Sequence, residues 1–431
     1  MNTLEKIYAL YGKSGKVSTD SRKIEKDSLF FALKGENFNG NKYASDALKK
    51  GASFAIIDEK EYCTSERTLL VDDALTCLQE LARHHRKELK IPILGITGTN
   101  GKTTTKELIA NVLAQKYKVE YTRGNLNNHI GVPLTLLKMN KSTEFGVVEM
   151  GANHPGEIAF LCQIAQPNYG IITNIGKAHL EGFGSFEGVI NTKSELYEFI
   201  AQNNGIAFYN RDNKLLAELT KNLPACVSYG QSNADITGEA VQSPPYIHAK
   251  VHFPKGVLYL NSKLIGNYNL ENILAAACIG SFFEVDPLKI QTAIKNYQPE
   301  NNRSQLIRNG ELTIVMDAYN ANPTSMAASI NSFSHFQPGP NSLILGDMLE
   351  LGEYAAEEHQ KILALIGEKD FANVFLVGNE FVKAAADTPY TSFKNVGELC
   401  TYLEKKSIKN GNILLKGSRG IQLEKVLEVL S

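Results

Sequence analysis

Apolar residues occur along this chain in two alternating patterns. Short apolar runs bounded by turn residues predict buried strands, and stretches with apolar residues at i, i+3 and i+4 predict amphipathic helices. The two patterns alternate along the 431 residues, and the alternation restarts after a charged run near residue 90 and again near residue 299. Such alternation is typical of mostly parallel α/β sheets. The sequence therefore predicts three α/β domains, at residues 1–90, 91–298 and 299–431.

The first predicted domain is a small α/β unit. Short strands are expected at 28–33 and 53–58, and an amphipathic helix at 73–87. The charged run RKELK at 86–90, just before Pro92, is predicted to be the linker to the next domain. Two polar segments, STDSR at 18–22 and KGENFNG at 34–40, lie beside the strands. Each is either a ligand-binding turn or a solvated turn.

The second predicted domain carries a strand, a glycine-rich turn and a helix at 91–117. Buried strands are expected at 145–150, 170–175 and 205–210. The β-rich region 231–265 contains Pro244-Pro245 and suggests an antiparallel annex to the sheet. A helix rich in small residues should begin near Asn267.

The third predicted domain is a smaller, doubly wound, Rossmann-like sheet. Its expected elements are strands at 312–317, 342–346, 374–378 and 413–416 and helices near 324–333, 355–367 and 421–430. Polar segments follow three of these strands, at 317–323, 346–348 and 416–419. Because the carboxyl ends of parallel strands share one edge of a sheet, this edge should face a cleft.

The segment GTNGKT at 98–103 has the composition of a phosphate-binding loop. Glycines let backbone N–H groups converge on phosphate oxygens, and the free amides at a helix start favour an anion. Lys102 would reach the outer phosphates and the Thr103 hydroxyl would bind Mg²⁺. The strict motif requires glycine where this chain has Ile96, so the loop is a variant. The alternative is a plain Gly/Thr turn, but the flanking strand and helix favour a nucleoside triphosphate.

Glu149 and His179 follow two of the central strands. An acidic group at a strand end would meet a magnesium ion held by the loop. The alternative for Glu149 is a surface carboxylate, and a single histidine such as His179 is usually structural or solvated.

Composition restricts the possible partners. Lys and Arg number 45 against 46 Asp and Glu, so no net field attracts nucleic acid or an anionic membrane. The six cysteines show no paired spacing and are expected to be free, buried thiols. Neither a secretory signal nor a stretch of ~20 apolar residues occurs, so we expect a cytoplasmic protein without a membrane span. Nothing in the sequence demands more than a monomer.

Several motifs of this chain resemble those of the Mur ligases. They are TGTNGKTTTK at 97–106, NLNNHIGVPLTLL at 125–137, EMGANHPGEI at 149–158 and AHLEGFGSFEGVINTKSEL at 178–196. Within the family, DAYNANPTSM at 317–326 and LGDMLELG at 345–352 resemble members that add D-alanyl-D-alanine to UDP-N-acetylmuramoyl tripeptide. The resemblance covers essentially the whole chain. It implies an ATP- and Mg²⁺-dependent peptide ligase of peptidoglycan precursor synthesis that works through an acyl phosphate.

The resemblance also implies a set of site residues. ATP would be bound by the loop and three further residues: Gly98, Thr99, Asn100, Gly101, Lys102, Thr103, Thr104, Asn272, Arg303 and Asp317. The catalytic set would be Lys102, Glu149, His179 and Lys193, and the metal ligands Thr103, Glu149, His179 and Lys193. The UDP-sugar would meet Asp20, Ser21 and Arg22, and the dipeptide would meet Asn320, Asn322, Ser325, Lys416, Ser418 and Arg419.

Lys193 matches the lysine that Mur ligases carry as a carbamate. A carbamate turns a cation into an oxygen ligand for a hard metal ion. Without the resemblance, the pattern predicts an exposed helix lysine at this position. The N-terminal domain departs from the family, which often has Asp-Gly-His where this chain has Asn39-Gly40-Asn41. The contacts on the sugar side are therefore open.

Three other functions stay open at this point. The nearest is another Mur-type ligase, or a folylpolyglutamate synthase-like ligase, with a different acceptor. The second is a GTPase-like switch or binding module, although no Asn-Lys-x-Asp guanine motif occurs. The third is an inactive regulator of the same fold, although the loop lysine, Thr103, Glu149 and Lys193 are all present.

Overall fold

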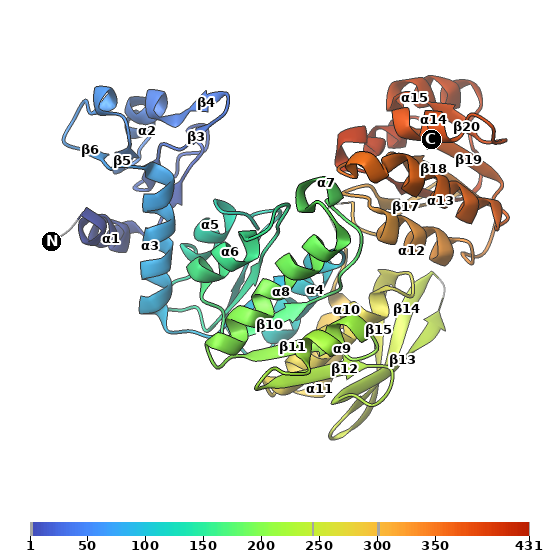
Figure 1. Cartoon of the computed structure of the whole chain (residues 1–431), viewed down its shortest axis with the longest axis horizontal. Helices are drawn as coiled ribbons and strands as arrows, with labels where there is room; N and C mark the ends of the chain where they lie inside the picture. Colours follow the sequence, from blue (N-terminus) through green and yellow to red (C-terminus); the bar gives the residue numbers. More distant parts are fainter. Residues whose placement is uncertain (1–2, 244, 300–301, 431) are drawn as a thin grey trace.

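A computed structural model describes residues 3–243, 245–299 and 302–430. Within these residues the strands form a four-stranded, a nine-stranded and a six-stranded sheet and a two-stranded hairpin. The large sheets define an N-terminal, a central and a C-terminal unit, which follow one another along the long axis of the molecule (Figure 1). The predicted α/β class with mostly parallel sheets is confirmed. The exact domain boundaries stay predictions.

The N-terminal unit is built on a parallel sheet in the order β1-β2-β5-β6. Its strands are β1 Val17–Ser18, β2 Leu29–Phe31, β5 Phe54–Ile57 and β6 Thr68–Leu70, and the hairpin is β3 Lys34–Gly35 with β4 Phe38–Asn39. The helices are α1 Thr3–Ser14, α2 Ala44–Lys49 and α3 Ala74–Leu89, with 3₁₀ turns at Gly40–Tyr43 and Lys60–Tyr62. The apolar strand residues are buried between these helices because both faces of the sheet are covered.

The predicted linker at 86–90 is wrong, because α3 continues through Leu89. Arg86 is buried against the central unit and donates hydrogen bonds to Ala165 O (3.0 Å), Gln166 O (3.0 Å) and Asn168 Oδ1 (2.8 Å). These oxygens lie at and just beyond the end of α6, Glu157–Ala165, where carbonyls lack helical partners. A helix docked on the central unit therefore joins the first two units (Figure 1).

The central sheet has the order β15-β14-β13-β12-β11-β10-β7-β9-β8. Its parallel strands are β7 Ile93–Thr97, β8 Val119–Tyr121, β9 Phe145–Glu149, β10 Tyr169–Ile172, β11 Ile206–Asn210, β12 Cys226–Gly230 and β13 Ile236–Ser243. Two antiparallel strands follow, β14 Tyr246–Phe253 and β15 Gly256–Ile265, as the annex prediction required. Pro244 is one of the two prolines on which that prediction was based, and it lies outside the described residues.

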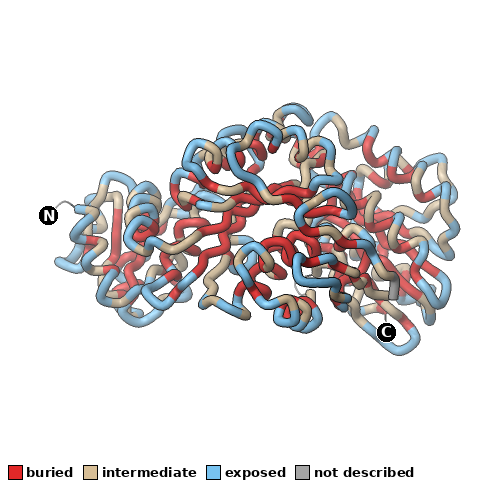
Figure 2. The backbone as a smooth tube through the Cα atoms, turned by 90° about the horizontal axis from the view of Figure 1, so that it is seen from below, coloured by how far each residue is buried: buried red, intermediate tan, exposed pale blue. Residues whose placement is uncertain are grey.

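Helices cover both faces of the central sheet. They are α4 Lys102–Leu113, α5 Gly131–Leu136, α6, α7 Leu180–Phe183, α8 Phe186–Gln202, α9 Lys214–Thr220, α10 Asn269–Phe282 and α11 Pro287–Asn296. Alternate residues of β7 point to opposite faces: Leu94 and Ile96 pack with α4 and α10, whereas Ile93 belongs to the core under α6 and α8. Figure 2 shows the buried residues concentrated in the interior of the molecule and the exposed ones along its outer turns.

The C-terminal sheet has the order β16-β17-β21-β18-β19-β20, with only the edge pair β16–β17 antiparallel among the described strands. The strands are β16 Gln305–Asn309, β17 Leu312–Asp317, β18 Asn341–Gly346, β19 Asn373–Val377, β20 Thr391–Phe393 and β21 Gly411–Lys416. The helices are α12 Pro323–Phe333, α13 Ala355–Gly367, α14 Asn379–Ala384 and α15 Val396–Lys405, and a 3₁₀ turn lies at Gly352–Tyr354.

Two sequence-based expectations fail in detail. The α-helix predicted near 421–430 is replaced by 3₁₀ turns at Arg419–Ile421 and Leu423–Glu428. Leu423 and Val426 both pack into the sheet core, and a 3₁₀ turn aligns residues three apart. All six cysteines are free, but only Cys162 and Cys278 are buried. No helix in the described part of the chain combines the length and apolarity needed to cross a bilayer.

Candidate active site

The loop between β7 and α4 is held in a shape that only glycine permits at two positions. Gly98 and Gly101 have φ of +139° and +76°, in the region that side chains disfavour. A Cβ atom on Gly101 would lie 2.8 Å from Asn272 Oδ1. The loop therefore passes directly against α10, and strand, loop and helix follow one another as predicted.

The end of β10 anchors this loop from the other side. Asn174 O accepts from Thr99 N (2.9 Å), and Asn174 Oδ1 accepts from Asn100 N (2.9 Å). Thr173 Oγ1 donates to Asn100 O (2.6 Å). The backbone of the loop tip is thus fixed by neighbouring strand ends, which leaves the helix N-terminus open to the pocket.

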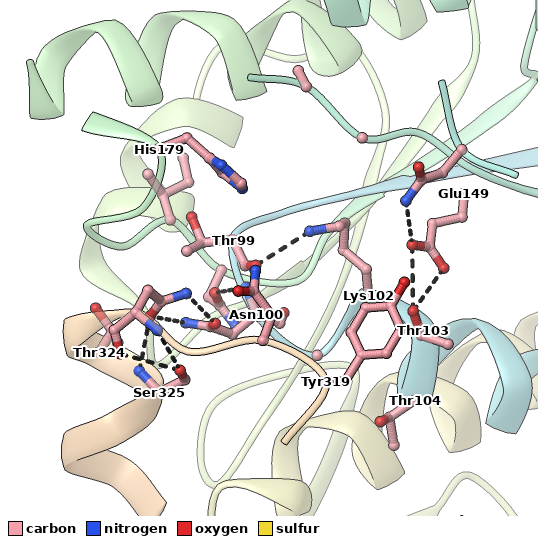
Figure 3. A pocket seen from close by; sticks show the side chains of 18 of the residues that line it. Thr99, Asn100, Lys102, Thr103, Thr104, Glu149, His179, Tyr319, Thr324 and Ser325 are labelled. Atoms are coloured by element: carbon pink, nitrogen blue, oxygen red, sulfur yellow. Dashed lines mark hydrogen bonds between the residues drawn. The ribbon is translucent and has the colours of Figure 1, made fainter. Parts of the chain in front are cut away.

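Lys102 folds back over the loop. Its Nζ donates to Gly98 O (2.7 Å) and Thr99 O (3.2 Å), as Figure 3 shows in part. Burial lowers the pKa of Lys102; the Glu149 carboxylate opposes this shift, and the Arg303 guanidinium adds to it. Lys102 and Arg303 both line the pocket, and two cations facing one cavity favour an anion there.

Glu149 ends β9 and faces the start of α4. Its carboxylate accepts hydrogen bonds from Thr103 Oγ1 (3.0 Å to Oε2) and Asn127 Nδ2 (2.9 Å to Oε1). The buried Lys106 Nζ lies 3.5 Å from Oε2. Burial alone would raise the pKa of Glu149, but Lys106, Lys102 and Arg303 outweigh it and lower the pKa. An ionised carboxylate beside a threonine hydroxyl is a donor set that suits Mg²⁺.

The two other predicted metal ligands are not joined to Glu149. His179 lines the same pocket, but its Nδ1 lies 2.5 Å from the Glu350 carboxylate of the C-terminal unit. Lys193 lies behind the pocket wall, with Nζ 3.4 Å from Ala152 O and 5.3 Å from the centre of the Phe183 ring. No cluster of three or more His, Cys, Asp and Glu side chains suited to a metal occurs among residues 3–243, 245–299 and 302–430.

Lys193 is buried, and the exposed helix lysine expected from pattern alone is wrong. Burial, together with the charge of Lys102, lowers the pKa of Lys193 to about 7. A lysine of this pKa is partly neutral near pH 7, whereas an ordinary lysine is almost fully protonated. The amine therefore has the chemical state that reaction with CO₂ requires.

Asn272 lies where the loop meets α10. Its Oδ1 accepts from Thr105 Oγ1 (2.8 Å), and its Nδ2 donates to Asn269 Oδ1 (2.7 Å). Both bonds stay within the central unit. The side chain also lines the pocket beside Gly101.

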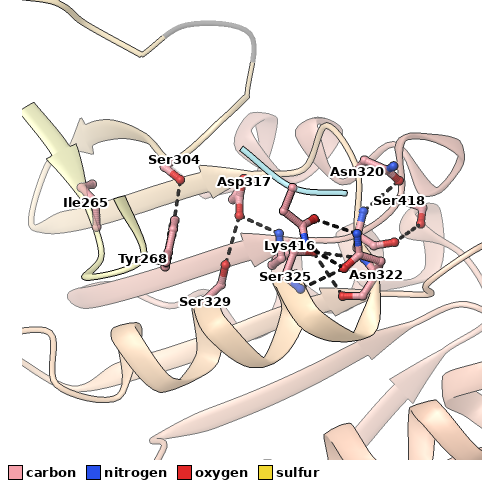
Figure 4. A network of polar contacts seen from close by, with 12 residues as sticks. Ile265, Tyr268, Ser304, Asp317, Asn320, Asn322, Ser325, Ser329, Lys416 and Ser418 are labelled. Atoms are coloured by element: carbon pink, nitrogen blue, oxygen red, sulfur yellow. Dashed lines mark hydrogen bonds and ion pairs between the residues drawn. The ribbon is translucent and has the colours of Figure 1, made fainter. Parts of the chain in front are cut away.

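The C-terminal unit closes the other side of the pocket (Figure 4). Lys416 Nζ lies 2.6 Å from Asp317 Oδ2, which also accepts from Ser329 Oγ (3.1 Å). Asn322 Nδ2 donates to Asn100 Oδ1 of the phosphate loop (2.8 Å). The ends of β17 and β21 therefore meet the ends of β7, β9 and β10 across one cavity of about 1110 Å³.

Most of the predicted residues line this cavity. They are Thr99, Asn100, Gly101, Lys102, Thr103, Thr104, Glu149, His179, Asn272, Arg303, Asp317, Asn320, Asn322, Ser325 and Lys416. The lining does not include Gly98, which is packed against Thr173, nor Lys193, Ser418 and Arg419. Ser418 instead donates to Ala321 O and accepts from Leu349 N (3.0 Å), so it joins two loops at the strand ends.

The predicted UDP-sugar residues belong to the N-terminal unit and lie apart from the cavity. Arg22 and Asp20 form a bidentate pair with both N–O distances 2.9 Å, and Ser21 O accepts from Lys50 Nζ (2.8 Å). Asn41, in the segment that departs from the family, is fully buried and exchanges two hydrogen bonds with Asp58. Asn41 is therefore part of the structure of this unit rather than an exposed contact.

Sequence reasoning did not single out several residues of the site. Lys106 and Asn127 hold Glu149, and Tyr268 and Tyr319 line the cavity. The Arg303 guanidinium lies 3.8 Å from the centre of the Tyr319 ring. Lys106, Asn127 and Tyr319 fall inside motifs that the sequence had already singled out, but their individual roles required their partners.

Comparison with known proteins matches three family models to successive parts of the chain. The Mur ligase family catalytic domain matches residues 15–94, the Mur ligase middle domain 96–280, and the Mur ligase glutamate ligase domain 302–419. The Bacillus subtilis protein named UDP-N-acetylmuramoyl-tripeptide--D-alanyl-D-alanine ligase is 34% identical, covering 96% of this chain and 92% of its own length.

Solved structures are similar over the same extent. MurF from Acinetobacter baumannii has a TM-score of 0.88 at 30% identity, covering 96% of this chain and 93% of its own. MurF ligase from Thermotoga maritima, in complex with ADP, has a TM-score of 0.85 at 28% identity, covering 100% and 98%. The chain belongs to the Mur ligase family.

Proposed function

We propose that this chain is an ATP-dependent peptide ligase that joins D-alanyl-D-alanine to UDP-N-acetylmuramoyl tripeptide, in peptidoglycan precursor synthesis. The observation that carries the proposal is the single cavity lined both by the phosphate loop and by the segment 317–325. That segment belongs to the DAYNANPTSM motif. The Bacillus subtilis protein whose name states this activity is 34% identical along 96% of the chain.

The reaction balances as two transfers. The tripeptide carboxylate attacks the γ-phosphorus of ATP, the bond to the β–γ bridging oxygen breaks, and an acyl phosphate and ADP result. The dipeptide amine, after losing a proton, attacks the acyl carbon, and the C–O bond to phosphate breaks. An amide and inorganic phosphate are the products. The first transfer is needed because a carboxylate repels nucleophiles and has no good leaving group.

Lys102, Arg303 and the loop amides would hold the nucleotide phosphates. Phosphoryl transfer requires mainly that charge be neutralised and the reactants be aligned. Both cations affect the pKa of Glu149, so both lie close to the start of α4. A phosphate between them would offset both the burial and the Arg303 charge that lower the pKa of Lys102.

Thr103 and Glu149 would hold the first magnesium ion, and His179 with a carbamate on Lys193 would hold a second. Bound Mg²⁺ neutralises phosphate charge and fixes the phosphate geometry. Asn127 and Lys106 orient the Glu149 carboxylate and keep it ionised. The low pKa of Lys193 supports its carbamylation.

The remaining residues would place the organic groups. Asn272 and Asp317 both line the cavity; Asn272 would contact adenine and Asp317 would bind the ribose hydroxyls. Asn320 and Ser325 on the C-terminal edge, with Arg419 beyond it, would meet the dipeptide. The Asp20–Arg22 turn would hold the UDP group in the N-terminal unit, so that the tripeptide reaches across to the central cavity.

The first experiment measures phosphate release from ATP with purified UDP-N-acetylmuramoyl tripeptide, with and without D-alanyl-D-alanine. The proposal expects release that requires both substrates, and a product heavier by the dipeptide. Release driven by glutamate or by a diamino acid would instead indicate a sister ligase of the Mur or folylpolyglutamate synthase type. No release with any acceptor would overturn the ligase function.

A further inference from the structure

Asn100 and Asn322 join the phosphate loop to the C-terminal unit. Asn322 Nδ2 donates to Asn100 Oδ1 (2.8 Å), and Asn100 Nδ2 lies 3.4 Å from Asn322 Oδ1. The two residues are 222 positions apart in the chain; Asn322 is buried and Asn100 is partly buried. This reciprocal amide pair is a direct contact between the loop tip and the start of α12.

Each amide is held from behind by its own unit. Asn322 caps α12: its Oδ1 accepts from Ser325 N (2.9 Å), and Ser325 Oγ accepts from Asn322 N (3.1 Å). The Asn100 backbone is fixed by Asn174 and Thr173 at the end of β10. The Asn322 side chain cannot turn away without giving up the cap of α12, and the fixed backbone of Asn100 places its side chain opposite Asn322.

Further contacts join the same two surfaces. Gly176, just beyond the anchor of the loop, approaches Thr324, because a Cβ on Gly176 would lie 2.8 Å from Thr324 Oγ1. Lys177 Nζ lies 2.8 Å from Glu358 Oε1 on α13. Of these contacts, the Asn100–Asn322 pair lies at the cavity wall itself, since both residues line it.

Both Asn side chains therefore bind each other rather than face solvent. A ligand on the loop and a ligand on the α12 edge would each favour the arrangement in which this pair is formed. A contact present in only one arrangement of two units links the affinities of their ligands, and the linkage is reciprocal.

We propose that Asn100 and Asn322 are positioning residues that make the phosphate loop and the α12 edge one binding surface, so that nucleotide and dipeptide bind cooperatively. The inference rests on the proposed function, because it takes ATP and D-alanyl-D-alanine as the ligands of those two surfaces. The Asn322 amide thus binds Asn100 of the phosphate loop and does not contact the dipeptide.

Titration calorimetry tests the coupling. The dissociation constant of D-alanyl-D-alanine is measured on the full chain with UDP-N-acetylmuramoyl tripeptide, with and without a non-hydrolysable ATP analogue and Mg²⁺. In the wild type we expect the analogue to tighten dipeptide binding about tenfold. The affinity for the analogue alone is measured in parallel.

Two variants break the pair in different ways. Asn322→Ser keeps a side chain that caps α12, since serine caps as well as asparagine, but its hydroxyl is too short to reach Asn100. Asn100→Ala keeps the loop backbone. Each variant should reduce the coupling to less than about twofold, and the double variant should lose no more, because the two side chains act as one contact. The control is Asn331→Ser, at an exposed position of the same helix.

The outcomes separate the inference from the proposed function. Coupling retained in Asn322→Ser and Asn100→Ala, or lost equally in Asn331→Ser, overturns the inference. A wild type that binds both ligands without coupling also overturns it and leaves the ligase function intact. A wild type that binds no dipeptide overturns the proposed function and the inference with it.

Discussion

Lys416 and Asp317 form an ion pair between two adjacent parallel strands, with Nζ 2.6 Å from Oδ2 (Figure 4). The two residues are register partners at the carboxyl ends of β21 and β17. The Lys416 side chain is only 2% exposed. The sequence predicted that Lys416 contacts the dipeptide and that Asp317 contacts the ribose. In the structure Lys416 is paired with Asp317 and orients its carboxylate.

Lys416→Met should destabilise the chain and weaken ATP binding. Removing the lysine leaves the Asp317 carboxylate, whose side chain is 17% exposed, without its cation and should cost about 1–3 kcal/mol. The measurements are urea unfolding and the KM for ATP. Lys250→Met is the control, because Lys250 pairs with Glu239 at the surface (3.1 Å) and should change little. Unchanged stability in Lys416→Met would show that the ion pair with Asp317 does not contribute to folding.

A carbamate on Lys193 should depend on pH. Burial and Lys102 place the pKa of Lys193 at about 7. Only the neutral amine reacts with CO₂, so the carbamate should be abundant above that pH and lost as the pH falls below it. Neutral amine should decrease roughly tenfold between pH 8 and pH 6. The ¹³C NMR signal of carbamate, recorded with labelled bicarbonate, measures this change.

Lys193→Ala tests the role of that group. We expect most ligase activity to be lost and partly restored by added short-chain carboxylates, which can replace a carbamate as oxygen ligands. Lys193→Arg should give no carbamate signal and no rescue, because the guanidinium still fills the space. Full activity in the alanine variant would remove Lys193 from the mechanism.

Gly101→Ala should reduce ADP binding at least about tenfold. Alanine at φ of +76° is strained by about 1–2 kcal/mol, and its Cβ would press on Asn272. Calorimetric titration of ADP measures the loss. Gly12→Ala in α1 is the control, since no atom lies within 4 Å of the added Cβ. If Gly101→Ala binds ADP normally, the loop is not the phosphate site.

Arg86→Ala should loosen the connection between the first two units. Three hydrogen bonds from one buried guanidinium are lost, and the carbonyl of the buried residue Ala165 loses its side-chain partner, at a cost of about 1–3 kcal/mol. Hydrogen exchange along α3 and the scattering profile report the change. Arg83→Ala, exposed on the same helix, is the matched control. If residues 86–90 were a flexible linker, the Arg86→Ala and Arg83→Ala variants would show the same hydrogen exchange along α3.

Tyr319→Ala should raise the KM for ATP about fivefold, whereas Tyr319→Phe should leave it near the wild-type value. The ring lies 3.8 Å from the Arg303 guanidinium and 5.7 Å from that of Arg419. Its π face, which phenylalanine also has, holds Arg303 toward the phosphates at ~0.5–2 kcal/mol. A phenylalanine variant as impaired as alanine would assign the effect to the hydroxyl.

What the sequence alone determined is local. The alternation of strands and helices, the turn at 98–103 and the polar strand ends each depend on residues close in the chain, so the three sheets and the part of the cavity lining formed by the phosphate loop and the strand ends were predictable. Motif resemblance extended this prediction to residues such as Asn272 and Arg303.

Tertiary structure decided which of those residues bind each other. The charged run at 86–90 looked like a linker because its partners lie about eighty positions away, at the end of α6. Lys193 looked exposed because the wall that buries it comes from other segments, including Ala152 and Phe183. The pairs Lys416–Asp317 and Asn100–Asn322 join residues 99 and 222 positions apart. Periodicity records which face of an element is buried, but charge pairing and desolvation depend on distances that only the packed chain sets.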